Sequence, residues 1–147
     1  MDIQYDTKGT GNPTMLFIHG GGGDRSHLQP QFDYFSQKTL AVNVDLLGYG
    51  QSKSDLPEAN FKQHADYLAA LCKAHNIHKI IPVGHSSGGS VALELARHHR
   101  DLVTAVVMIS SGIIVPPAAI DGMASTLENI KNTNDLNGIL HTLADNL

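Results

Sequence analysis

Short apolar runs alternate with amphipathic stretches along the first 112 residues of the chain. The apolar runs are roughly four to eight residues long and are bounded by Gly, Pro or Asp, as expected of strands that are covered on both faces. The stretches between them repeat apolar residues at helical spacing. This alternation predicts an α/β fold, a mostly parallel sheet with flanking helices. The predicted strands are 3–6, 15–20, 40–48, 79–85 and 103–110, and the predicted helices are 25–37, 60–76 and 87–99.

The pattern changes after residue 112. The connection SGIIVPPAAIDGM (111–123) is marked by Pro and Gly, and STLENIKNTNDLNGILHTLADNL (125–147) reads as amphipathic helix with no further strand. We therefore predict two parts, a sheet-containing part over 1–112 and a helical part over 113–147.

Composition and charge narrow the class of protein. Hydrophobic residues make up 41% and charged residues 16%, which is ordinary for a globular domain. A net charge of −4 with no cationic stripe argues against a nucleic-acid partner. No apolar run approaches the roughly 20 residues that cross a bilayer, and the start MDIQYDTKG lacks a targeting pattern, so we expect a cytoplasmic protein without a membrane partner.

The lone cysteine and the histidines do not suggest a cofactor. Cys72 falls on the apolar side of the predicted helix 60–76, and we expect a buried structural thiol. The nine histidines form no H-E-x-x-H motif and no cluster with carboxylates. We therefore expect neither a metal nor an organic cofactor.

The strongest chemical signal is GHSSG (84–88), which fits G-x-S-x-G. That pattern describes a sharp strand-to-helix turn that lifts a serine hydroxyl above the sheet. The structural condition is also met, since the predicted strand 79–85 precedes the turn and the predicted helix 87–99 follows it. We predict that Ser86 is a nucleophile, with a structural turn as the alternative.

A nucleophilic serine needs fixed N–H donors for the oxyanion that forms on the attacked carbonyl. The backbone N–H of Ser87 stands at the start of the predicted helix, where the helix dipole is positive. HGGGG (19–23) ends another predicted strand and lets the backbone approach a substrate. We predict Gly21 as the second donor and Gly22 as the next choice; a flexible loop or an anion-binding turn is the alternative.

These motifs resemble the N-terminal part of the α/β-hydrolase fold. The resemblance covers about residues 3–112 and is carried by FIHGGGG (17–23), DLLGYGQS (45–52) and VGHSSGGSVALELA (83–96). It implies that residues 113–147 begin a helical cap or lid over the active site. In DLLGYGQS we expect Asp45 to stabilise a turn rather than to act in catalysis.

The resemblance also implies a triad that this stretch does not complete. In the family an Asp or Glu and then a His follow the serine on later loops. His98 and His99 close the predicted helix 87–99, roughly 18 Å from its start, and cannot be the base. We expect the side chain of His85 to point to the other side of the turn from Ser86 and His19 to shape its loop, and nothing in the spacing requires His141 to reach Ser86. We expect the acid and base beyond residue 147, the fold to be incomplete at its C-terminal side, and this stretch alone to be inactive.

Taken together, the sequence predicts a serine hydrolase of the carboxylesterase kind that cleaves an ester, lactone or similar activated carbonyl of a small molecule through an acyl-enzyme on Ser86. Carbon–carbon bond hydrolysis and cofactor-free peroxidation are alternatives on similar scaffolds. A non-catalytic ligand-binding or receptor protein is the alternative from another class, and a phosphate cradle at GGGG is a third. An open edge at strand 103–110 would also favour self-association.

Overall fold

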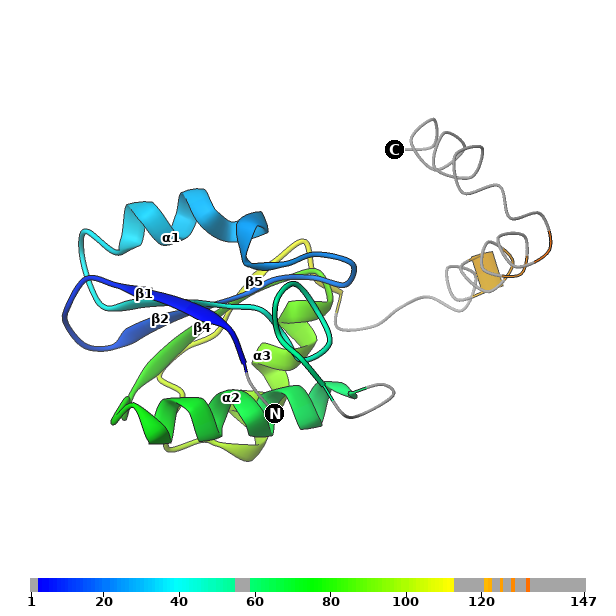
Figure 1. The fold of residues 1–147 in the computed structure, drawn as a ribbon. Helices are drawn as coiled ribbons and strands as arrows, with labels where there is room; N and C mark the ends of the chain where they lie inside the picture. The colour runs from blue at the N-terminus through cyan, green and yellow to red at the C-terminus, as the bar shows by residue number, and fades with distance from the viewer. Residues whose placement is uncertain are drawn as a thin grey trace. The chain divides into compact units, whose positions relative to one another are not determined.

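The computed structural model describes residues 3–54, 59–112, 121–122, 125, 128 and 132. The chain divides into two compact units, Met1–Gly112 and Ile113–Leu147. Most of the second unit, including the expected cap, lies outside the described residues, and its assignment as a cap stays a prediction. The first unit holds the sheet and its helices (Figure 1).

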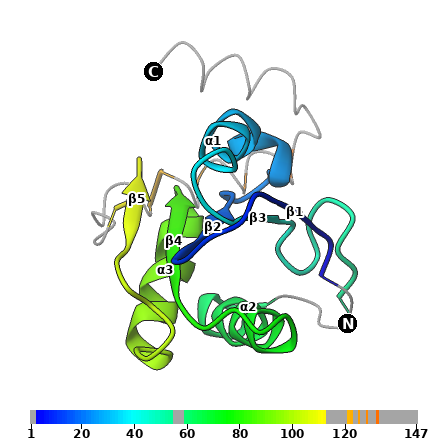
Figure 2. The same ribbon diagram turned by 90° about the vertical axis from the view of Figure 1, so that its left-hand side faces the viewer.

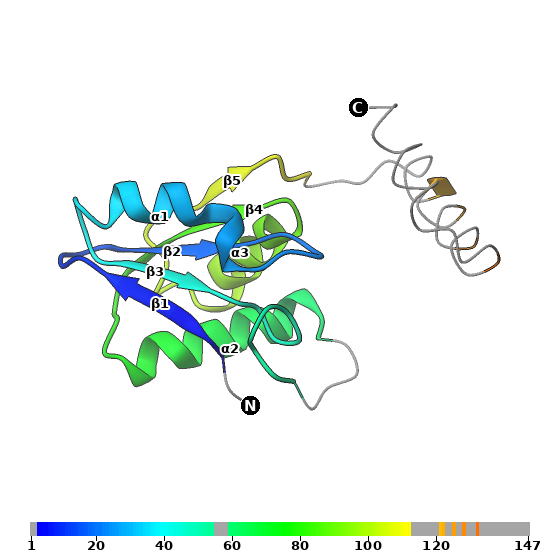
Figure 3. The same cartoon turned by 45° about the horizontal axis from the view of Figure 1, so that its top comes forward.

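The described part of the first unit contains a sheet with the strand order β1-β3-β2-β4-β5. Strand β1 pairs antiparallel with β3, whereas β3, β2, β4 and β5 run parallel to one another (Figure 3). The strands are β1 (Tyr5–Lys8), β2 (Thr14–Ile18), β3 (Ala41–Val44), β4 (Ile80–His85) and β5 (Val107–Ile109). The prediction of a mostly parallel α/β sheet is confirmed.

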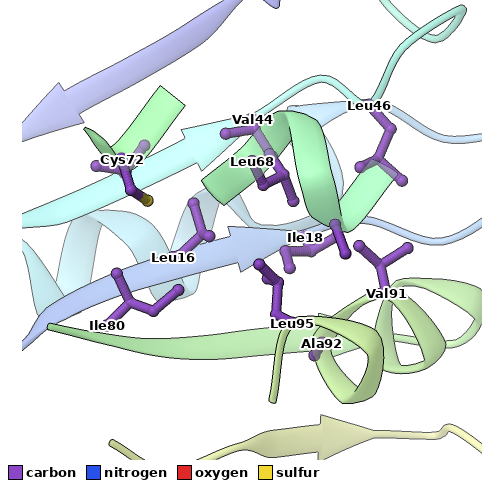
Figure 4. Close-up of a cluster of buried hydrophobic side chains, with 12 residues drawn as sticks. Leu16, Ile18, Val44, Leu46, Leu68, Cys72, Ile80, Val91, Ala92 and Leu95 are labelled. Atoms are coloured by element: carbon purple, nitrogen blue, oxygen red, sulfur yellow. The ribbon is translucent and has the colours of Figure 1, made fainter. Parts of the chain in front are cut away.

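Helices cover both faces of this sheet, as continuous apolar strands require. The 3₁₀ turn η1 (Arg25–Leu28) and α1 (Gln29–Phe35) lie on one face, and α2 (Phe61–Ala74) and α3 (Ser87–His98) lie on the other (Figure 2). The core on the α2 and α3 side is the larger (Figure 4). Cys72 belongs to it, 1% exposed, and burial raises the pKa of its thiol to about 11, in agreement with an inert structural cysteine.

Local sequence explains where the helices begin. Helix α2 starts after Asn60 with a capping box: the Asn60 side chain accepts from the Gln63 N–H, and the Gln63 side chain accepts from the Asn60 N–H, each at 2.9 Å. The predicted helix 25–37 is split into η1 and α1, because Pro30 lacks an N–H and fits only a first turn.

Strand β5 is shorter than the predicted strand 103–110. Only Val107–Ile109 continues the register with β4, and Val103 makes an isolated bridge to Ile80. Val107 is 40% exposed, and β5 has β4 as its one strand neighbour in the described part of the sheet. An edge strand with one neighbour has fewer ladder bonds to keep it regular, so the apolar run alone overstated its length. Self-association through this edge stays a prediction.

Candidate active site

The order of the strands brings two loops together at the carboxyl edge of the sheet. From β2 the chain continues to β3 on one side and later to β4 on the other, so the topology reverses between β2 and β4. Ile18, the last residue of β2, pairs with Gly84 near the end of β4. The loops that follow these strands therefore meet at a switch point, the place where open α/β sheets bind ligands.

Ser86 occupies the turn between β4 and α3 in a strained conformation. Its φ of 52° and ψ of −123° lie in a region that side chains other than glycine rarely adopt. Its N–H donates to the Ile109 carbonyl at 2.9 Å, and its own carbonyl accepts from the Ser111 hydroxyl at 2.6 Å and from the Gly89 N–H at 3.0 Å. The side chain is exposed. These bonds hold the strained backbone, as expected of a G-x-S-x-G turn.

Glycines allow the turn that carries Ser86 to pack closely against the end of β2. A Cβ on Gly88 would collide with the carbonyl oxygens of Ile18 and His19, and a Cβ on Gly84 would collide with the backbone of Gly88. The start of α3 therefore lies directly against the end of β2. The turn after β2 is equally close, since a Cβ on Gly20 would lie 3.0 Å from the Ser86 Cβ.

The structure brings the two predicted donors Gly21 and Ser87 into contact. The Gly21 N–H donates to the Ser87 hydroxyl at 2.7 Å. Ser87 is the first residue of α3, so its own N–H has no partner within the helix. Gly22 has a φ of 71°, and no heavy atom lies within 4 Å of the position of an added Cβ, so it borders open space. The oxyanion roles of Gly21, Ser87 and Gly22 stay predictions.

A cavity of about 240 Å³ adjoins these donors. Its wall includes Gly21 and Ser87, and the rest comes from the loop after β3, the start of α2 and the first turns of α3. The remaining lining residues are mostly apolar: Leu46, Leu47, Gly48, Tyr49, Ser54, Ala59, Phe61, His64 and Val91. A concave site that combines apolar side chains with polar groups is suited to a small organic ligand.

His19 is fully buried and fixes the turn that carries Gly21. Its Nε2 accepts from the Leu46 N–H at 3.0 Å, so the proton is on Nδ1, which donates to the Gly20 carbonyl at 2.7 Å. Burial lowers its pKa, which keeps the ring neutral. Both ring nitrogens are engaged, so His19 shapes the loop, as the sequence indicated, and is not free to act as a base.

Sequence reasoning missed His64, which is 4% exposed in the first turn of α2 and lines the cavity. Its Nδ1 is buried without a hydrogen-bond partner in the described part of the chain. The sequence did indicate that His64 faces the core, because His64 lies four residues before Leu68 and therefore on the same helix face. Phe61, the first residue of α2, also lines the cavity and is 47% exposed.

We expect His64 to make the fold sensitive to mild acid. Burial lowers its pKa from the ordinary value of 6.5, so between pH 6.5 and the folded pKa the unfolded chain binds more protons than the folded chain. Its contribution is fully present above pH 6.5 and is lost as the pH falls through the folded pKa. The decrease in Tm between about pH 7.5 and about pH 5 should be smaller in His64→Gln than in the wild type.

The matched control for this comparison is His78→Gln, since His78 is exposed. It should reproduce the wild-type dependence of Tm on pH. Equal dependence in His64→Gln and the wild type would show that burial does not disfavour the charged form of His64.

Asp45 is buried and holds the loop after β3. Its carboxylate accepts from the backbone N–H of Arg25 at 2.8 Å, from the Gln51 N–H at 2.9 Å and from Arg25 Nη1 at 2.9 Å. Arg25 also pairs with Asp6 on β1 at 2.9 Å. Asp45 is therefore a structural carboxylate, as the sequence indicated.

Three of the other histidines considered above contact neighbouring side chains. His98 and His99 are at the far end of α3, where they contact Glu94 at 3.0 Å and Asp66 at 2.9 Å. The ring of His85 packs edge-on against that of His27, with centroids 6.3 Å apart. His141 lies outside the described residues. Within the described ranges, no group of three or more His, Cys, Asp or Glu could hold a metal, and no helix is long and apolar enough to cross a membrane.

This chain resembles known proteins both in sequence and in fold. A family model described as the alpha/beta hydrolase fold matches residues 13–134. Among solved structures, a thermophilic esterase from Thermogutta terrifontis superposes with a TM-score of 0.77 at 27% identity, over 89% of this chain and 48% of that chain.

Two curated relatives are similar in sequence. The dihydrolipoyllysine-residue acetyltransferase component of the acetoin cleaving system of Cupriavidus necator is 36% identical over 108 residues, 74% of this chain and 29% of that protein. The putative carbamate hydrolase RutD of Serratia proteamaculans is 32% identical over 99 residues, 67% of this chain and 37% of that protein. The chain spans less than half the length of each of these three relatives.

Proposed function

This chain belongs to the α/β-hydrolase-fold family, and on that premise we propose that it is the nucleophile-bearing part of a serine hydrolase. The substrate class is a small molecule with an ester, lactone or similarly activated carbonyl. Hydrolases are found among the relatives in sequence and in structure, including the putative carbamate hydrolase and the Thermogutta esterase.

The observation that carries the proposal is the conformation of Ser86. A serine held at a φ of 52° between a buried strand and a helix is a costly arrangement for a plain connection. Its hydrogen bonds to Ile109 and Ser111 keep the residue there. Strain of this kind is typical of functional sites, and here it presents an exposed hydroxyl beside the glycine turn.

In the proposed reaction the Ser86 oxygen attacks the substrate carbonyl while a general base takes the hydroxyl proton. The carbonyl oxygen becomes an oxyanion, stabilised by the Ser87 N–H and the turn that carries Gly21. The bond to the leaving group breaks, and the base returns the proton to that group. Water then attacks the acyl-enzyme and releases the acid and Ser86.

We propose that the base and the acid that orients it come from a part of the protein beyond residue 147. His19 is fully engaged, and His98 and His99 are held at the other end of α3. Residues 113–147 would begin the cap over the site. The cavity beside Gly21 would receive part of the substrate.

The test is covalent labelling of the protein at its native length. A fluorophosphonate loses fluoride to a nucleophilic serine, and we expect one phosphonyl group per chain, located on Ser86 by peptide mass mapping. Labelling of a different residue, or an unchanged intact mass, would contradict the assignment of Ser86 as the nucleophile. The unchanged mass would in addition favour a ligand-binding protein on the same fold.

A further inference from the structure

We propose that Ser87 is a second catalytic residue through its side chain. In this proposal the Ser87 hydroxyl donates to the oxyanion, and the Gly21 N–H acts on the oxyanion indirectly, by donating to that hydroxyl. The proposal rests on the proposed function, because it assigns a donor for the oxyanion formed when Ser86 attacks.

The Gly21 N–H already has a hydrogen-bond acceptor in the structure. It has one proton, and that proton is directed at the Ser87 oxygen at 2.7 Å, a short distance for an N–H donor. While this bond is present, Gly21 cannot donate fully to a substrate oxygen. The glycine turn therefore reaches the reacting centre through Ser87.

The Ser87 hydroxyl accepts a hydrogen bond and keeps its own proton to donate. A serine hydroxyl has one proton to donate and two lone pairs to accept with. Since Gly21 uses a lone pair, the O–H proton is available, and none of the described residues accepts it. The side chain is partly exposed and lines the cavity of about 240 Å³, so this proton can point toward a ligand.

The start of α3 adds further donors beside the Ser87 hydroxyl. The Ser87 N–H is one of the unpaired donors at the start of α3, where the helix dipole is positive. The N–H and O–H of the same residue can bind one oxygen together. A hydroxyl that accepts a hydrogen bond also becomes a better donor, because hydrogen bonds in a chain polarise one another. Ser87 would thus supply two donors to the negative charge.

The competing explanation is that the Ser87 oxygen only occupies the place of the oxyanion and must rotate away before reaction. The two explanations predict opposite effects for Ser87→Ala. If the hydroxyl is a donor, its removal slows the reaction. If it is an obstacle, its removal frees the Gly21 N–H and leaves the rate unchanged or faster.

The experiment compares Ser87→Ala, Ser87→Thr and the wild type at native length, with p-nitrophenyl acetate as substrate. Removal of one oxyanion donor lowers kcat by roughly 10² to 10³. Because the freed Gly21 N–H can compensate in part, we expect a decrease of about 10- to 100-fold in kcat for Ser87→Ala, with little change in KM. Ser87→Thr keeps the hydroxyl and should retain activity close to that of the wild type.

Three results would overturn the proposal. A kcat for Ser87→Ala equal to or above that of the wild type means that the hydroxyl is not a donor, while the proposed function stands. Equal losses in Ser87→Ala and Ser87→Thr point to packing rather than donation. No hydrolysis by the wild type overturns the proposed function together with this inference. If Ser87→Ala has a Tm well below that of the wild type, Ser87→Cys is measured in its place. A folded Ser87→Cys variant with the wild-type kcat would contradict the proposal in the same way as an active Ser87→Ala.

Discussion

Ser86→Ala should reduce kcat for ester hydrolysis by the protein at native length by about 10⁶, which leaves only the residual rate, roughly 10³ to 10⁴ above that in water, that oxyanion donors and substrate binding supply. The reason is that Ser86 supplies the oxygen that is proposed to bond to the substrate carbonyl. Neither the cavity nor the oxyanion donors can supply that oxygen. Alanine keeps the Cβ and the same backbone strain, so the free energy of unfolding should change little. The measurement is steady-state hydrolysis of an activated ester, together with a thermal melt of each variant.

Ser90→Ala is the matched control, because Ser90 lies in the first turn of α3, only four residues after Ser86. None of the hydrogen bonds described for the site involves its side chain. It should hydrolyse the ester at the wild-type rate. If Ser86→Ala keeps more than a small fraction of the activity at an unchanged Tm, the nucleophile is another residue.

The second large effect is expected on stability, from Gly88→Ala. Helix propensity alone predicts that this change stabilises the helix by up to about 1 kcal/mol. In the structure the added methyl group would collide with the carbonyl oxygens of Ile18 and His19, which belong to the backbone and cannot rotate away. We expect a decrease of at least about 3 kcal/mol in the free energy of unfolding, the upper part of the range for overpacking.

Chemical denaturation of Gly88→Ala and Gly21→Ala tests this expectation. Both variants add the same methyl group, but the Cβ at Gly21 would meet the Ser87 oxygen at 3.5 Å, an ordinary contact. Gly21→Ala should therefore unfold near the wild-type denaturant concentration. A Gly88→Ala variant as stable as Gly21→Ala would show that α3 can move away from β2 without cost.

Much of this fold could be predicted from local sequence because its elements have strong signals. The predicted helix 60–76 is present as α2, which begins after a capping box at Asn60. The apolar run at β2 indicated a strand buried on both faces, and it is one. Strand β5 was overestimated, because an apolar run does not reveal how many neighbours a strand will have.

The candidate site was predictable in part. The pattern around Ser86 specifies a turn, and the structure contains the turn and its glycine contacts. The bond between Gly21 and Ser87 could not be foreseen, since 66 positions separate the two residues and only the pairing of β2 with β4 brings them together. His64 was missed because a histidine on an apolar helix face is hard to distinguish from a solvated one before the neighbouring loop is known.

The backbone conformation of Ser86 also has a consequence for how such a chain can diverge. A residue held in this region costs on the order of 1 to 3 kcal/mol, and glycine is the residue that adopts it most easily. Under the proposed function, catalysis and thermal stability therefore make opposing demands on position 86. A change of Ser86 to glycine would relieve this strain and remove the proposed nucleophile in one step, while the sheet, the helices and the cavity keep their contacts.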